Sequence, residues 1–274
     1  MKLTDLLGQQ NIQLLEMVLR KNSQTVLFQT SGQSEIELAF SWLSDRIQQD
    51  GHEVQAITPE DGKIIKIEAA RQIITQTIIS PRTRRYFLIF AADKMPINTQ
   101  NALLKELEEP GKNRFFFLFT NQADLLLSTI RSRCQKTNLL GIDETAIRAY
   151  FAKTHPNTPN EKLNQIAFMA NRSIERWQEL LDDPQEFERS SQLAALAKQV
   201  ISANIYQKIT IINRVSTTRE QAIEFVNLVL KIQAHLLAKQ PSQMKVHQTD
   251  RWLRSLDLLQ HNSSLKLGLM AAVL

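Results

Sequence analysis

The feature that most constrains the fold of this chain is an alternation of short apolar runs with amphipathic stretches over the first 140 residues. The short runs occupy residues 26–28, 54–57, 86–90 and 115–119. Between them, residues 35–49 and 64–79 place apolar side chains at three- and four-residue spacing, which predicts helices. Buried strands that alternate with helices are typical of a parallel sheet with crossover helices. We therefore expect residues 1–140 to form an α/β domain.

Helical patterns dominate from residue 141 onward. We expect a helical, lid-like domain over residues 141–188 and an all-helical domain over residues 189–274. The polar segment 182–191 contains Pro184, which makes it the best candidate for a linker between the two. A chain of 274 residues is long enough to bury the core of several such domains.

Composition narrows the classes of function. Apolar residues make up 43% of the chain and charged residues 22%, as in ordinary globular proteins. The chain has no apolar run of membrane-spanning length, and Asp5 interrupts the N-terminal apolar residues, so we expect a cytoplasmic protein. The single cysteine, Cys134, excludes an intrachain disulfide, and we expect no metal site because the five histidines are scattered.

The positive charge is concentrated in the last third of the chain. Residues 190–274 hold 10 basic and 4 acidic residues, whereas residues 1–140 hold 17 and 15, and residues 141–189 hold 6 and 9. Such an excess fits contact with nucleic acid, although dispersed basic residues are more often a solvated surface.

Two segments on either side of the fourth apolar run carry a family resemblance. Residues 101–110 read Asn-Ala-Leu-Leu-Lys-Glu-Leu-Glu-Glu-Pro, an amphipathic helix that ends at Pro110, and residues 129–134 read Thr-Ile-Arg-Ser-Arg-Cys. Both resemble the clamp-loader branch of the AAA+ ATPases. The resemblance implies an α/β AAA+ domain, a helical lid and a helical collar domain.

The phosphate-binding loop that this family implies is degenerate. Active members carry a glycine-rich loop that ends in Gly-Lys-Ser/Thr after the first strand. The matching stretch here, residues 26–39, is one residue short, keeps only Gly32, and places Glu35 about where the lysine belongs. A carboxylate at that position repels polyphosphate, so we expect no bound nucleotide cofactor. The degenerate loop consists of Thr30, Ser31, Gly32, Gln33, Ser34 and Glu35.

The acidic pair that would position magnesium and water is also missing. Counting back from Asn101, its two positions fall on Phe90 and Ala91, and neither side chain can hold a metal ion. Asp93 lies nearby, but it matches a later position and is read as a helix-start or surface carboxylate. Two independent losses indicate that hydrolysis was abandoned.

The Ser132-Arg133-Cys134 segment is intact. In clamp loaders the arginine of this segment projects into the nucleotide site of a neighbouring subunit, so the resemblance assigns Arg133 as an arginine finger that acts in trans. The alternative is a surface arginine at a loop. Cys134 is expected to be a small buried residue rather than a nucleophile.

Other positions are weaker candidates. Residues 120–121 match a γ-phosphate sensor but favour a turn. Arg176 matches the lid arginine but favours a surface role or an ion pair within the chain. The basic cluster Arg82, Arg84 and Arg85 could contact DNA or a neighbouring subunit, or could be a solvated loop.

The whole chain is similar in architecture to the delta-prime subunits of bacterial DNA polymerase III clamp loaders, with specific motifs only between about residues 60 and 135. It lacks the cysteine-rich zinc module of many relatives. The resemblance implies gamma/tau-type and delta-type clamp-loader subunits as partners and, indirectly, the sliding clamp and primed DNA. Two alternatives remain: an active or nucleotide-switched ATPase of the same family, and a DNA-binding adaptor outside replication.

Overall fold

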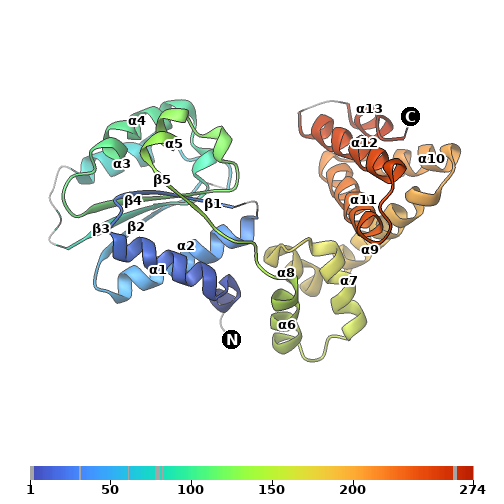
Figure 1. Ribbon diagram of the computed structural model, residues 1–274, viewed down its shortest axis with the longest axis horizontal. Helices are drawn as coiled ribbons and strands as arrows, with labels where there is room; N and C mark the ends of the chain where they lie inside the picture. The colour runs from blue at the N-terminus through green and yellow to red at the C-terminus, as the bar shows by residue number, and fades with distance from the viewer. Residues whose placement is uncertain are drawn as a thin grey trace. The chain divides into compact units, whose positions relative to one another are not determined.

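The computed structural model describes residues 3–30, 32–60, 62–77, 81, 83–261 and 264–273, so Ser31 and Arg82 of the predicted sites lie outside the described residues. The chain forms two compact units (Figure 1). Unit 1 comprises residues 1–163 and 172–175, and unit 2 comprises residues 164–171 and 176–274. The three-domain division at residues 140 and 188 stays a prediction.

A five-stranded parallel sheet forms the centre of unit 1, as the alternation of apolar runs predicts. Its spatial order is β2-β3-β4-β1-β5. The strands are β1 (Thr25–Gln29), β2 (Glu53–Ile57), β3 (Arg85–Ile89), β4 (Arg114–Thr120) and β5 (Gln135–Asn138). The edge strand β5 was not predicted, because its polar sequence buries only Thr137 and gives no apolar run. It pairs with β1 from Val26↔Gln135 to Gln29↔Asn138.

Helices cover both faces of this sheet (Figure 1). On one face lie α1 (Gln9–Lys21) and α2 (Gln33–Gln49), and on the other lie α3 (Ile67–Thr77), α4 (Ile97–Glu108) and α5 (Ser128–Arg133). Short 3-10 turns span Leu3–Leu7, Ala92–Lys94 and Ala123–Leu125. Helix α6 (Glu144–Thr154) follows β5 in unit 1.

The aromatic strand β4 supplies core residues to both faces because successive side chains alternate. Phe116 and Leu118 join the apolar cluster that includes Leu103 of α4. Phe119 packs against the Phe28 ring at a centroid distance of 5.0 Å on the opposite face. The two-sided burial explains why this strand reads as a continuous apolar run rather than an alternating one.

Two helix starts differ from the sequence prediction. The helix predicted at residues 64–79 is observed at Ile67–Thr77, and residues 78–79 lie outside the described part of the chain. Helix α4 begins at Ile97 after Pro96, four residues before the predicted segment 101–110, and Asn98 lies in its first turn, where its Oδ1 accepts a hydrogen bond from the Thr99 amide.

Unit 2 is helical, in agreement with the pattern from residue 141 onward. Two helices run through the boundary between the units, α7 (Asn160–Ala170) and α8 (Ile174–Asp182). The remaining helices are α9 (Pro184–Ser202), α10 (Ile205–Val215), α11 (Arg219–Lys239), α12 (Gln243–Gln260) and α13 (Leu265–Met270). Phe225 and Trp252, whose ring centroids lie 5.9 Å apart, pack α11 against α12 in the core. No helix within the described residues is long and apolar enough to cross a membrane.

The prediction of a linker at residues 182–191 is wrong. Pro184 is the first residue of α9, a position at which proline is favoured because no amide hydrogen is needed there. Asp183 caps this helix by accepting hydrogen bonds from the amides of Gln185 and Glu186. The polar composition and the proline therefore mark a capped helix start rather than an irregular connection.

Candidate functional site

The degenerate loop lies between β1 and α2 of unit 1, and the side chain of Glu35 fills it. Gly32 is the N-cap of α2, and Glu35 is the third residue of the helix. The Glu35 side chain is buried, and its Oε1 accepts a hydrogen bond of 2.9 Å from the Ile142 amide. A methyl group placed on Gly32 would lie only 1.9 Å from Glu35 Oε2. The carboxylate thus occupies the space directly against the loop backbone.

This position explains why polyphosphate does not fit the loop. The N-terminus of a helix attracts anions, and here the carboxylate of Glu35 is an anion supplied by the chain itself. Two further carboxyl groups, those of Glu37 and Glu175, lie close by. Partial burial and the charge of Glu175 raise the pKa of Glu37 to about 7, whereas a hydrogen bond from Gln33 acts to lower it. A nucleotide would have to displace a buried, hydrogen-bonded carboxylate and approach two further carboxyl groups.

The loop is instead tied to the segment that follows the sheet. The Ser34 hydroxyl accepts a hydrogen bond of 3.0 Å from the Ile174 amide, in addition to the contact between Glu35 and Ile142. Both acceptors are buried. The first turn of α2 therefore works as a structural joint within unit 1.

The two positions expected for the acidic pair carry no metal-binding atoms. The Phe90 ring packs edge-on against Phe40 at 5.4 Å, and Ala91 is buried with a left-handed φ of 49°. Asp93 is engaged in the structure, because its Oδ1 accepts a hydrogen bond of 2.5 Å from the Thr120 hydroxyl. The residues at this edge of the sheet do not fit a magnesium nucleotide.

The predicted sensor residues have local structural partners. The Thr120 hydroxyl accepts a hydrogen bond of 3.0 Å from the Gln122 amide, as in a Thr-initiated turn, and is buried. The Asn121 amide donates to Gln33 Oε1 over 3.2 Å. These contacts support the turn-forming interpretation.

Arg133 lies at the other chemically distinctive place in unit 1, the exposed end of α5. It is the last residue of the helix, where a cation interacts favourably with the helix dipole. Its Nη1 donates to the Thr129 carbonyl over 3.0 Å, and its Nη2 donates to Glu108 Oε2 over 3.1 Å. The side chain remains 32% exposed. A guanidinium has five N–H groups in a planar fork, so these two bonds leave N–H groups for an external phosphate.

The residues beside Arg133 hold the end of α5 in place. The Ser132 hydroxyl donates to the Thr129 carbonyl over 3.1 Å. Cys134 is buried in the apolar cluster of α4 and α5, and this burial raises the pKa of its thiol to about 12. Because the thiolate is the reactive form of cysteine, Cys134 is an inert packing residue, as the sequence predicts.

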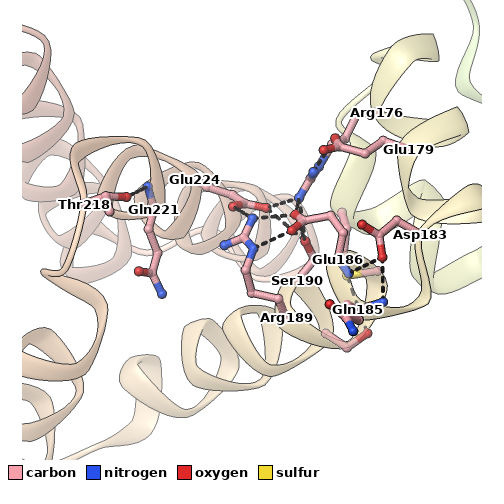
Figure 2. Close-up of polar contacts among 12 residues, drawn as sticks. Arg176, Glu179, Asp183, Gln185, Glu186, Arg189, Ser190, Thr218, Gln221 and Glu224 are labelled. Carbon is pink, nitrogen blue, oxygen red and sulfur yellow. Dashed lines mark hydrogen bonds and ion pairs between the residues drawn. The ribbon is translucent and has the colours of Figure 1, made fainter.

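Arg176, the lid arginine of the resemblance, forms ion pairs within unit 2 (Figure 2). Its guanidinium contacts Glu179 at 2.5 Å, Glu186 at 2.6 Å and Glu224 at 2.8 Å. Arg189 contacts two of the same carboxylates, Glu186 and Glu224. The hydrogen bond from Arg189, with a further contribution from Arg176, lowers the pKa of Glu186 to about 2, although partial burial acts in the opposite direction. The expected ion-pair role is confirmed.

Arg84 and Arg85 lie at the start of β3 and have partners in unit 1. Arg84 lies over the Phe115 ring at 5.7 Å. Arg85 donates to Glu53 Oε2 over 2.6 Å, directly across the β2–β3 pair, and to the Gln76 carbonyl. Contact of these arginines with DNA or a neighbouring subunit stays a prediction.

Sequence reasoning missed one residue of the Arg133 site. Glu108 appears in the sequence as one of several outward-facing charges on an amphipathic helix. Its pairing with Arg133 joins residues 25 positions apart on α4 and α5. No local pattern signals this contact, because it depends on how the two helices pack.

Comparison with known proteins finds relatives for the first half of the chain. Residues 9–143 match the family described as DNA polymerase III, delta subunit. DNA polymerase III subunit delta' from Pseudomonas aeruginosa is 29% identical over 120 residues, which cover 43% of this chain and 37% of the relative. The delta' subunit from Bacillus subtilis is 39% identical over 93 residues, which cover 33% of this chain and 28% of the relative. The matches thus span only 37% and 28% of the lengths of these relatives.

A solved structure extends the likeness in fold to the rest of the chain. A DNA polymerase III gamma subunit-related protein from Thermotoga maritima aligns with a TM-score of 0.53 and 19% identity, covering 95% of this chain and 97% of that one. At this identity the likeness concerns the fold alone. Residues 9–143 are thus similar to the delta and delta' subunits of DNA polymerase III, and the chain has a fold like that of the gamma subunit-related protein.

Proposed function

We propose that this chain is a non-hydrolysing subunit of a DNA polymerase III clamp loader, which helps to place the sliding clamp on primed DNA. The observation that supports this most strongly is the contrast within unit 1: the Glu35 carboxylate fills the loop that would hold a nucleotide, whereas Arg133 presents an exposed guanidinium at the end of α5. The names of the matching relatives support the same assembly.

The proposed role of Arg133 is to act in trans on an ATPase neighbour. The guanidinium fork matches phosphate oxygens, and its permanent charge stabilises the charge that develops on the transferring phosphoryl group. Arginine fingers raise phosphoryl-transfer rates by roughly 10³ to 10⁵. The hydrolysing subunit holds the nucleotide and metal, and this chain supplies one side chain.

The remaining assignments follow from the same proposal. Gamma/tau-type and delta-type subunits are the partners, and the helical region 189–274 is the collar that joins them in the ring. The clamp and primed DNA are reached through the assembled loader, in the cytoplasm. The basic excess of residues 190–274 is compatible with a position close to DNA.

The test is reconstitution of the loader with its other subunits and an Arg133→Ala chain. Assembly should be intact, and the ATPase activity stimulated by DNA and clamp should fall at least 100-fold at the site that receives the arginine. Lys136→Ala, which removes a positive charge three residues away on β5, is the matched control and should change activity less than twofold. Unchanged activity with Arg133→Ala would sink the proposal.

A binding measurement separates the proposal from the active-ATPase alternative. Titration of the isolated chain with fluorescent ATP and magnesium should show no saturable binding, because Glu35 occupies the loop. Micromolar binding that is abolished by substitutions in residues 30–35 would favour the alternative.

A further inference from the structure

We infer that Glu108 is a positioning residue for Arg133, which holds the guanidinium in the orientation that a neighbouring nucleotide site requires. This inference rests on the proposed function of Arg133 as a finger. It assigns a role to the acidic end of α4, which the family resemblance treats only as a helix surface.

Two N–H groups of the guanidinium are bonded within the chain, and its other N–H groups are left for an external phosphate. Nη1 is held by the Thr129 carbonyl of the same helix, and Nη2 is held by Glu108 of the neighbouring helix. Together with the covalent attachment through Nε, these two fixed points define the plane of the fork, because the guanidinium is rigid and planar. One bond alone would leave the group free to rotate about the axis of that bond.

The two helices that carry these residues are rigidly joined. Leu103 and Leu107 of α4 pack in the same buried cluster as Ile130 of α5. The relative position of α4 and α5 is therefore set by apolar packing and does not depend on the ion pair. Glu108 extends this rigidity to a long side chain at the protein surface.

The ion pair is too exposed to serve mainly as a stabilising element. The Glu108 side chain is 56% exposed and that of Arg133 is 32% exposed. Exposed pairs contribute little to stability. An arginine side chain loses rotamer entropy when it is fixed, and Glu108 brings about part of that ordering before a phosphate arrives. Such preorganisation raises the rate of reaction more than it raises the stability of the fold.

The experiment uses the fully reconstituted clamp loader with single substitutions in this chain. Glu108→Ala should lower the kcat of the stimulated ATPase about tenfold and leave the nucleotide affinity of the neighbouring subunit unchanged. Glu108→Gln keeps an acceptor for Nη2 and should lose less activity. Glu109→Ala removes the same charge from the adjacent residue, the C-cap of α4, and should change kcat less than twofold.

A double substitution distinguishes positioning from a general effect of charge or folding. Because Glu108 acts through Arg133, Glu108→Ala combined with Arg133→Ala should lower kcat no further than Arg133→Ala alone. Equal kcat values for Glu108→Ala and Glu109→Ala, beside a large loss with Arg133→Ala, would overturn the role of Glu108 and leave the proposed function standing. A rise in kcat with Glu108→Ala would also overturn it, because it would mean that the carboxylate restrains the finger. No loss with Arg133→Ala would instead refute the proposed function.

Discussion

The loop before α2 and the end of α5 belong to the same domain but show opposite uses of charge. At the loop, the Glu35 carboxylate is buried against Gly32 and bonded to the Ile142 amide, so the anion-binding capacity of a helix N-terminus is satisfied within the chain. At the end of α5, the Arg133 guanidinium is ordered but still exposed. If Arg133 acts as we propose, a nucleotide-binding fold has lost its own site and kept the group that serves a neighbour.

After removal of the arginine itself, the largest effect in this comparison should come from Arg133→Lys. Lysine keeps the positive charge but carries its N–H groups on a single nitrogen, so it cannot reproduce the planar fork whose two Nη atoms bond to Thr129 and Glu108. We expect the stimulated ATPase of the reconstituted loader to fall at least tenfold. Steady-state kcat and KM measure this, and activity within twofold of the unmodified loader would show that charge alone suffices.

Arg176→Ala should have the next largest effect, on the stability of unit 2. The substitution removes the guanidinium that contacts Glu179, Glu186 and Glu224 and leaves Arg189 to pair with the last two (Figure 2). Because the Arg176 side chain is only 20% exposed, we expect a loss of about 2 kcal/mol.

Urea unfolding followed by tryptophan fluorescence measures this loss, since Trp177 and Trp252 are both in the core of unit 2. Arg20→Ala is the control, because it removes an ion pair with Glu16 in which the arginine side chain is 81% exposed. That change should cost less than about 0.5 kcal/mol. Equal costs for the two variants would contradict an internal role for the lid arginine.

Glu35→Ala should weaken the joint between the loop and residue 142 without creating a nucleotide site. It leaves the buried Ile142 amide without its acceptor, which costs roughly 1 to 3 kcal/mol. Hydrogen exchange followed by mass spectrometry should show faster exchange at this amide. Fluorescent ATP should still not bind, because Phe90 and Ala91 provide no metal ligands. Tight binding by this variant would mean that Glu35 alone blocks an otherwise functional site.

The smallest effect concerns pH and the carboxyl group of Glu37. Its pKa is raised to about 7 in the folded protein, so the folded state holds a proton that the unfolded chain releases near its ordinary value of 4.5. The contribution of Glu37 to the free energy of unfolding is therefore fully present below pH 4.5 and is lost as the pH rises through 7. The full shift corresponds to about 3 kcal/mol, which solvent screening at the partly exposed Glu37 reduces to about 1 kcal/mol. Glu37→Gln should remove this dependence. Thermal unfolding of both proteins at pH 5 and pH 8 measures it; a constant difference between them would contradict the raised pKa.

Much of the fold could be predicted from the sequence, because its core strands are unusually apolar. The four runs at 26–28, 54–57, 86–90 and 115–119 all form strands of one parallel sheet. The edge strand β5 could not be predicted, since a strand paired on one side and largely exposed needs no apolar run. The start of α9 was misread because Asp182-Asp-Pro patterns are equally typical of loops and of capped helices.

The candidate site, like the fold, was predictable only where residue type alone decides the outcome. The loss of the nucleotide motifs is a matter of residue type at fixed positions, so Glu35, Phe90 and Ala91 could be identified from the sequence. The contacts that Ser34 and Glu35 make in place of a nucleotide could not be predicted, because the hydrogen bonds from Ile174 and Ile142 join residues more than 100 positions apart. The pairing of Arg133 with Glu108 is likewise a result of tertiary packing.

The most direct test of the central claim compares two loaders that differ only in this chain, one with Arg133→Ala and one with Glu35→Ala. We measure the ATPase rate stimulated by DNA and clamp, at equal amounts of assembled complex. The account predicts at least a 100-fold loss at the receiving site with Arg133→Ala and less than a twofold change with Glu35→Ala. The reverse order, with Glu35→Ala the more damaging and Arg133→Ala without effect, would contradict it.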